Sequence, residues 1–225
     1  MVLASDEKVI AESVFTCNRT LSARLVPELE RLLALAGWGY ADIDLFASAT
    51  GPGSFTGVRC GVATVQGLAL ATAKPCVGFS SLAMLAMNFS LASLPVCPLL
   101  DARKNEVYGA LYDLSAIMPL PILPDSVMTP QLIFDRIAAV TDKQIIFAGE
   151  GALRYQDEIT DYFDGRAVFS PFTLNVGRAV NGVLLAQDIF KRGGSTEPAQ
   201  LLPVYLRASE AEYAKMARQP ATPGG

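Results

Sequence analysis

The residues best placed to do chemistry lie in a glycine-rich segment at 50–59, which reads Thr-Gly-Pro-Gly-Ser-Phe-Thr-Gly-Val-Arg. Glycines allow the backbone to adopt positive φ and to approach a neighbouring group closely. A hydroxyl at the start of a helix can cap it, and exposed N–H groups there can hold a phosphate oxygen. The candidate phosphate contacts are therefore Gly51, Gly53, Ser54 and Thr56.

The same segment also has a purely structural interpretation. It lacks the Gly-Lys-Ser/Thr ending of a Walker loop and the glycine spacing of the Rossmann fingerprint. Two alternatives therefore stay open at this point, a phosphate-binding loop and a strand-to-helix turn without a ligand, and the chemistry of the residues favours the turn.

Other candidate catalytic groups are few. The chain has no histidine, which excludes Ser-His-Asp and Cys-His catalysis and every metal site that uses imidazole. Asp42 and Asp44 precede a predicted strand and fit a turn. Asp101 beside Arg103 fits a cation site or an ion pair in a hairpin, and the ion pair is favoured. Glu150 stands alone between two glycines, so the sequence offers no convincing acid–base pair.

Composition excludes several classes of protein. The 225 residues are 51% hydrophobic and 18% charged, with a net charge of −4. A disordered chain would be less apolar, and a chain that binds nucleic acid by itself would normally carry a basic excess. The length allows one large domain or two small ones.

The cysteines and the first residues predict a cytoplasmic protein. Cys17, Cys60, Cys76 and Cys97 form no Cys-x-x-Cys pair and no metal-ligand spacing, so we interpret them as small buried hydrophobic residues. The first seven residues contain acids and no basic region, unlike a signal peptide.

An apolar stretch at 80–100 is long enough to span a bilayer. Pro95 and Pro98 interrupt it, and no basic cluster flanks it. We therefore reject a membrane span and predict a buried strand, a helix that begins at Ser80 or Ser81, and a second buried strand.

The elements that must position these groups alternate between strands and helices, which predicts an α/β protein with a mostly parallel sheet. Each half begins with a hairpin and later runs from a strand into a Gly-x-Gly turn, which is a weak sign of duplication. The predicted strands are 1–4, 9–16, 45–49, 75–79, 94–100, 106–113 and 144–148, and the predicted helices are 22–36, 54–72, 80–87, 129–140 and 175–193, with a loop at 119–130.

The predicted helix at 54–72 is apolar on nearly every side. Gly53, Gly57 and Gly61 recur at every fourth position and leave a flat groove along it. A helix that is apolar all round is buried all round, and one sheet covers only one side. The remaining cover is either the helix at 22–36 or another subunit.

Residues 51–61 resemble the signature of the TsaB (YeaZ) family. The likeness continues through residues 67–70, 77–82, 100–108 and 203–207 and covers most of the chain from Ser13 onward. The first motif is long and specific, whereas the last is short and would be weak alone.

The resemblance implies an α/β fold with the two-lobed architecture of actin and Hsp70-like ATPases (ribonuclease H-like), with mixed sheets flanked by helices, and similarity to M22 glycoprotease-like proteins. It implies an N-terminal lobe at 1–94 and a C-terminal lobe at 95–200. A segment at 201–218 is expected to pack back, and the tail at 219–225 is expected to be disordered.

The resemblance also implies a function. The family acts in bacterial synthesis of N6-threonylcarbamoyladenosine at tRNA position 37, as a non-catalytic subunit that binds the catalytic TsaD paralogue, with the TsaE ATPase in a larger complex. We expect no cofactor on this chain alone, with ATP and a metal in the partner subunits, mainly indirect contact with tRNA and no membrane contact.

The pairing surface of the family is a helical bundle, which maps onto the predicted helices at 22–36 and 54–72. The implied interface residues are Leu25, Leu29, Leu32, Gly57, Val58, Gly61, Val62 and Val65.

The sequence departs from the family in two places. Members usually begin with a strand that ends in Asp-Thr-Ser, whereas residues 1–5 match the strand that follows it. We therefore expect the first strand of the N-terminal lobe to be missing, through a start codon assigned too late or through truncation. Leu21-Ser22 stands where many members carry His-Ser.

Two other functions remain open. One is a stand-alone actin-like ATPase or glycoprotease-like peptidase, which needs phosphate at the glycine turn or a nucleophile among Ser54, Thr56 and Cys60. The other is a homodimer that uses the same two helices.

Overall fold

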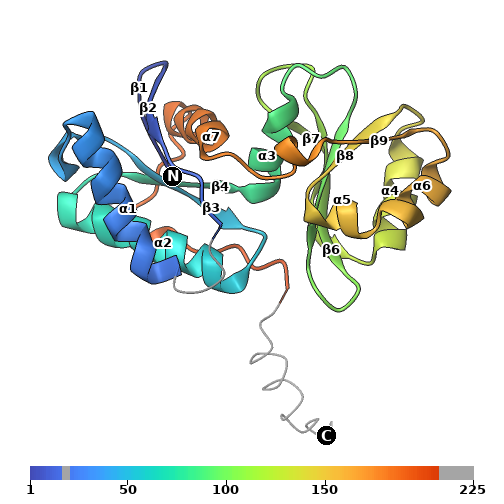
Figure 1. Ribbon diagram of the computed structural model, residues 1–225, viewed down its shortest axis with the longest axis horizontal. Helices are drawn as coiled ribbons and strands as arrows, with labels where there is room; N and C mark the ends of the chain where they lie inside the picture. The colour runs from blue at the N-terminus through green and yellow to red at the C-terminus, as the bar shows by residue number, and fades with distance from the viewer. Residues whose placement is uncertain (17–20, 208–225) are drawn as a thin grey trace, which may run out of the picture.

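The protein forms two lobes, which confirms the predicted two-lobed α/β architecture (Figure 1). The computed structural model describes residues 1–16 and 21–207. Strands β1–β4 lie in the N-terminal lobe with helices α1, α2 and α7, and strands β5–β9 lie in the C-terminal lobe with α4, α5 and α6. The predicted tail at 219–225 lies outside the described residues.

The N-terminal lobe contains two separate two-stranded ladders. Strands β1 (Val2–Ser5) and β2 (Lys8–Glu12) pair antiparallel, and β3 (Phe46–Gly51) and β4 (Cys76–Ser80) pair parallel. In the described residues β1 and β3 are not paired with each other, and the missing first strand of this lobe stays a prediction.

Three helices cover these ladders. Helix α1 (Leu21–Ala36) packs on β1 and β2, and α2 (Phe55–Thr72) packs on β3 and β4. Helix α7 (Ala179–Lys191) contacts all four strands, so it belongs to the N-terminal lobe. The predicted C-terminal lobe at 95–200 is wrong for this helix, because the chain returns to the first lobe after β9.

The C-terminal lobe is built on a five-stranded mixed sheet of order β7-β6-β5-β8-β9. The parallel part contains β5 (Val96–Asp101), β8 (Ile145–Ala148) and β9 (Ala167–Phe169), and β6 (Val107–Asp113) and β7 (Leu120–Met128) add antiparallel. The mostly parallel sheet that alternation predicts is therefore wrong here, whereas the mixed sheet implied by the resemblance is confirmed.

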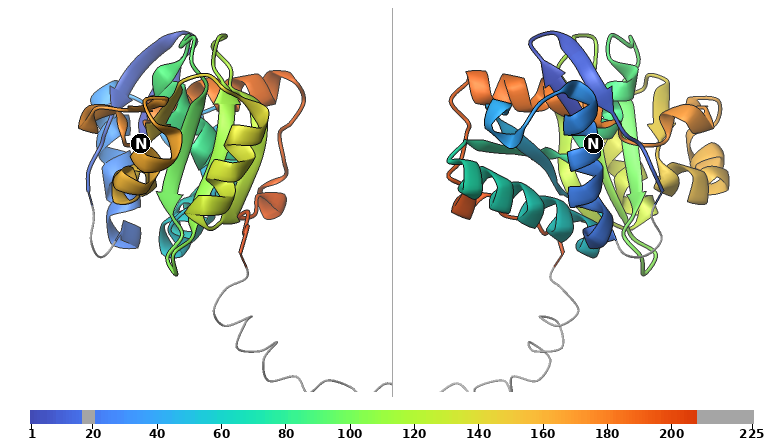
Figure 2. Two further views of the ribbon diagram at one scale, coloured as in Figure 1. Left: turned by 90° about the vertical axis from the view of Figure 1, so that its right-hand side faces the viewer. Right: turned by 60° about the vertical axis from the view of Figure 1, so that its left-hand side comes forward.

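Helices cover both faces of the C-terminal sheet, and α4 and α6 lie side by side on one of them (Figure 2). Phe134, Phe147 and Phe163 form the centre of the core beneath α4 (Pro130–Val140) and α6 (Gln156–Phe163). The short helix α3 (Ser81–Ala86) packs on the other face, in a cluster that also includes β4 and α7. One hydrophobic cluster therefore joins the two lobes.

Two local predictions are wrong. Residues 119–130, predicted as a loop, contain β7, because the prolines of this segment lie in an edge strand, where a missing N–H is tolerated. The last long helix begins at Ala179 rather than after Asn175. The Asn175 side chain is used elsewhere, since its Oδ1 accepts hydrogen bonds from Gly149 N and Ser170 Oγ.

The remaining elements are short. They are helix α5 (Glu150–Arg154) and the 3-10 turns η1 (Tyr40–Asp42), η2 (Met87–Phe89), η3 (Phe172–Leu174) and η4 (Pro198–Gln200). Among the described residues, no helix is both long enough and apolar enough to cross a membrane.

Candidate functional site

The glycine turn joins β3 to α2 and is closed by its own chain. Ser54 caps α2, because its Oγ accepts a hydrogen bond from Gly57 N at 3.4 Å. Gly51 has φ +117°, and a Cβ there would lie 2.9 Å from the carbonyl oxygen of Val204. Glycine is therefore required at 51 both by its conformation and by the close approach of the C-terminal segment.

This packing argues against a phosphate at the inner side of the turn. Gly51 and Pro52 are buried, and the nearest group to Gly51 is the negative end of a carbonyl dipole. Of the predicted phosphate contacts, Ser54 and Thr56 are exposed and Gly53 is partly exposed. The structural interpretation of the turn is the one that the geometry supports, and the phosphate contact at Gly51 stays a prediction.

A cation–aromatic cluster stands at the start of α2. The guanidinium carbon of Arg59 lies 3.7 Å from the centroid of the Phe55 ring, and Arg59 Nε donates to the Tyr205 hydroxyl at 2.5 Å. The rings of Phe55 and Tyr205 are 5.2 Å apart. The cluster thus fastens the C-terminal segment to α2, a contact that the sequence pattern did not reveal.

Helix α2 has one buried and one exposed face. Val62 and Ala69 are buried with Phe46 of β3 and with Leu201. The opposite face exposes residues at intervals of three or four, which we call the α2 stripe: Thr56, Arg59, Ala63, Gly67 and Leu70. Leu70 is 74% exposed, so α2 is not covered on every side within this chain.

The implied interface residues are only partly available to a partner. Leu32 and Val62 are 1% and 2% exposed and belong to the chain's own core, so their assignment to an interface is wrong. The cause is that helical spacing identifies an apolar face without showing what covers it. The other six are partly exposed: Leu25, Leu29, Gly57, Val58, Gly61 and Val65.

Of the three groove glycines, Gly61 is the one that faces the chain's own sheet. A Cβ on Gly61 would lie 3.0 Å from Ser48 Oγ of β3, whereas a Cβ on Gly57 would meet only Ser54 and one on Gly53 would meet nothing within 4 Å. Gly61 therefore lets α2 approach its own sheet, and the other two glycines do not serve this contact.

The candidate acids are structural in this arrangement. Asp101 binds Arg154 of α5 at 2.7 Å and Arg103 at 3.8 Å, so the favoured ion-pair interpretation is confirmed, with a stronger partner than the predicted one. Glu150 is exposed at the start of α5. Asp44 is 96% exposed and pairs with Lys74.

A partly buried carboxylate connects the lobes and was missed from the sequence. Asp125 of β7 accepts hydrogen bonds from Ser80 Oγ at the end of β4 and from the Tyr112 hydroxyl of β6, each at 2.5 Å. Burial and the nearby Asp125 raise the pKa of Tyr112 well above its ordinary value. The phenol therefore remains a hydrogen-bond donor to Asp125 within the C-terminal lobe, and the bond from Ser80 to Asp125 joins the two lobes.

The described residues contain no group of three or more metal-ligating side chains. Cys76 and Cys97 are buried thiols and Cys60 is partly exposed on α2. Burial raises the pKa of Cys97, so this thiol is unreactive. Cys17 lies outside the described residues.

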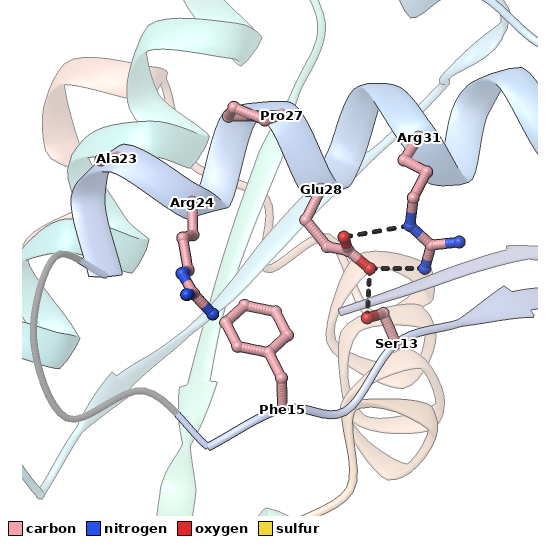
Figure 3. Close-up of a pocket in the computed structure, with 7 residues that line it drawn as sticks. All are labelled: Ser13, Phe15, Ala23, Arg24, Pro27, Glu28 and Arg31. Atoms are coloured by element: carbon pink, nitrogen blue, oxygen red, sulfur yellow. Dashed lines mark hydrogen bonds and ion pairs between the residues drawn. The ribbon is translucent and has the colours of Figure 1, made fainter.

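An open pocket of about 450 Å³ lies beside α1 (Figure 3). Glu28 is central to it and accepts from Arg31 Nη2 at 2.6 Å, from Arg31 Nε at 3.0 Å and from Ser13 Oγ at 2.5 Å. Arg24 projects toward the Phe15 ring. These contacts tie the end of the first hairpin to α1.

We expect Glu28 to titrate far below other glutamates. The Arg31 guanidinium, and next the Ser13 hydroxyl, lower the pKa of Glu28 from 4.5 to about 2. Since the folded pKa is the lower one, the stabilisation is complete above pH 4.5 and is lost as the pH falls from 4.5 to about 2. A carboxyl NMR titration measures this value, and Arg31→Ala is expected to return it toward 4.5. An ordinary pKa in the unaltered chain would contradict the ion pair.

Comparison with known proteins places this fold among described families. Residues 9–214 match the family model described as TsaD, tRNA N6-adenosine threonylcarbamoyltransferase. The chain is 28% identical over 216 residues to the tRNA threonylcarbamoyladenosine biosynthesis protein TsaB of Bacillus subtilis. The matched region covers 94% of this chain and 90% of that protein. It is 39% identical over 98 residues to the Escherichia coli protein of the same name, covering 43% and 42% of the two chains.

A solved structure agrees with these relatives. YeaZ from Pseudomonas aeruginosa superposes with a TM-score of 0.71 at 32% identity, over 84% of this chain and 85% of that chain. The lobes and the family model thus define a protein with the actin-like fold of the threonylcarbamoyltransferase class. Within that class, the chain belongs to the TsaB/YeaZ family.

Proposed function

We propose that this protein is a non-catalytic subunit in the synthesis of N6-threonylcarbamoyladenosine on tRNA, and that it binds a TsaD-type transferase through α1 and α2. The names of its relatives support the pathway. A TsaE-type ATPase joins the complex in this proposal. ATP and a metal ion are bound by those partners, and tRNA is contacted mainly by them.

The observation that carries the proposal is the α2 stripe. Ala63 and Gly67 are small and exposed, and Leu70 is the second most exposed large hydrophobic residue of the described chain. A long helix that exposes small residues beside a leucine is a surface on which a second helix can pack closely. Association buries Leu70 and gains the hydrophobic free energy that the isolated chain forgoes.

The test is a single substitution on the stripe. Ala63→Arg places a long charged side chain where the partner helix would approach, and we expect the affinity for the TsaD-type subunit to fall by about 100-fold or more in calorimetry. Folding is unaffected, because the side chain points to solvent. The matched control is Ala139→Arg on the exposed face of α4 in the other lobe, which is expected to bind normally.

Two results would count against the proposal. Tight binding by Ala63→Arg would show that the stripe is not the interface. Self-association of the pure chain that persists when the TsaD-type subunit is added, measured by sedimentation, would instead support a permanent homodimer.

A further inference from the structure

The segment at 201–207 begins in the core of the N-terminal lobe. Leu201 is 3% exposed and packs with Phe46, Val62 and Cys76. Just before it, Gln66 of α2 donates from Nε2 to the carbonyl of Pro198 at 3.1 Å. The start of the segment is therefore anchored beneath α2.

The middle of the segment lies against the glycine turn. Val204 N donates to Thr50 O of β3 at 2.8 Å. The Val204 carbonyl occupies the space beside Gly51, where only glycine leaves room for it. The next residue, Tyr205, contacts Phe55 and receives the hydrogen bond from Arg59. Val204 is therefore held by Thr50 at the end of β3. Tyr205 is held by Phe55 and Arg59 at the start of α2.

The end of the segment reaches the other lobe. Arg207 Nη1 donates to Ala102 O at 3.0 Å and pairs with Glu106 at 3.2 Å. These two residues are the base of the β5–β6 hairpin, since Ala102 N also donates to Glu106 O. The three residues of the hairpin tip all have positive φ, between 53° and 63°, which is unfavourable for side chains other than glycine. Arg207 thus braces a strained turn.

We propose that residues 201–207 are a clasp that fixes the position of the C-terminal lobe relative to α2, and that the clasp must be closed for the α2 stripe to bind its partner subunit. The first part rests on the contacts above. The second part rests on the proposed function, because it concerns the partner that α2 binds.

The chemistry of the clasp determines where it opens. Leu201 is held by apolar burial, whereas Arg207 is held by one hydrogen bond and one partly exposed ion pair. Such an ion pair contributes little by itself, so the contact with the C-terminal lobe is the weaker end. Opening therefore begins at Arg207 and proceeds toward Tyr205 and Val204, which frees the Arg59 side chain.

The test combines hydrogen exchange with partner binding. Arg207→Ala removes the side chain that is hydrogen-bonded to Ala102 and ion-paired with Glu106 of the C-terminal lobe. We expect the exchange rate of Val204 N–H and of the first amides of α2 to rise about tenfold in the full chain, and the affinity for the TsaD-type subunit to fall about fivefold to tenfold. Tyr205→Phe removes only the hydroxyl. We expect it to raise the exchange rates and to lower the affinity as well, but by less than Arg207→Ala does.

Arg192→Ala is the matched control, because Arg192, which follows the last residue of α7, forms an exposed pair with Asp188 of that helix, away from the clasp. We expect it to change neither quantity. Unchanged exchange at Val204 in both clasp variants would overturn the clasp, whatever the partner does. Faster exchange with unchanged affinity would overturn its coupling to binding. Absence of binding by the unaltered chain would overturn the proposed function and the coupling, while exchange would still decide the clasp.

Discussion

Val62→Asp is expected to unfold the N-terminal lobe, whereas Ala63→Asp, one position further along the same helix, is expected to leave it folded. Val62 is 2% exposed against Phe46, Ala69 and Leu201. An aspartate there is a charge buried among apolar side chains. Such a charge costs about 3–5 kcal/mol, and the lost apolar contact adds to it.

The size of this effect follows from the small net stability of proteins, which is about 5–15 kcal/mol. Urea unfolding followed by the fluorescence of Trp38 measures it, because Trp38 packs in the cluster of Leu3, Leu32 and Leu33 in the same lobe. Ala63→Asp loses only helix propensity, about 0.7 kcal/mol. Similar midpoints for the two variants would contradict the orientation of α2.

This pair of variants also shows what the sequence could and could not predict about α2. Its limits, its Ser54 cap and its apolar character are local properties, and the structure confirms them. Which face meets the core depends on β3 and on residues near 201, which are far away in sequence. The spacing of Gly57 and Gly61 is the same whether a partner or the chain's own sheet fills the groove.

The same reasoning applies to the lobes. Strands and helices with strong periodicity were predicted within a few residues, because hydrophobic pattern and capping act locally. The return of α7 to the first lobe and the contact of Arg207 with Ala102 depend on chain topology. Asp125 carries no signal at all in the sequence, since its two partners come from β4 and β6.

Gly149→Ala is expected to destabilise the C-terminal lobe by about 3–5 kcal/mol, through backbone strain and overpacking together. Gly149 has φ +100°, and a Cβ there would lie 2.4 Å from the Leu99 carbonyl oxygen. That carbonyl belongs to central strand β5 and cannot move without disturbing its ladder. The amide of Gly149, which donates to Asn175 Oδ1 at 2.7 Å, would have to shift with it.

Gly165→Ala separates backbone strain from overpacking. Gly165 also has positive φ, +73°, but a Cβ there would meet nothing within 4 Å, so only the conformational cost of about 1 kcal/mol remains. Chemical denaturation followed by circular dichroism measures the free energy of unfolding of the Gly149→Ala and Gly165→Ala variants. If the two variants lose equal stability, close approach is not why glycine stands at 149. If Gly149→Ala loses far more stability than Gly165→Ala, close approach of a carbonyl explains the glycine at 149. The same explanation then applies to Gly51, because Gly51 faces the Val204 carbonyl and Gly149 faces the Leu99 carbonyl.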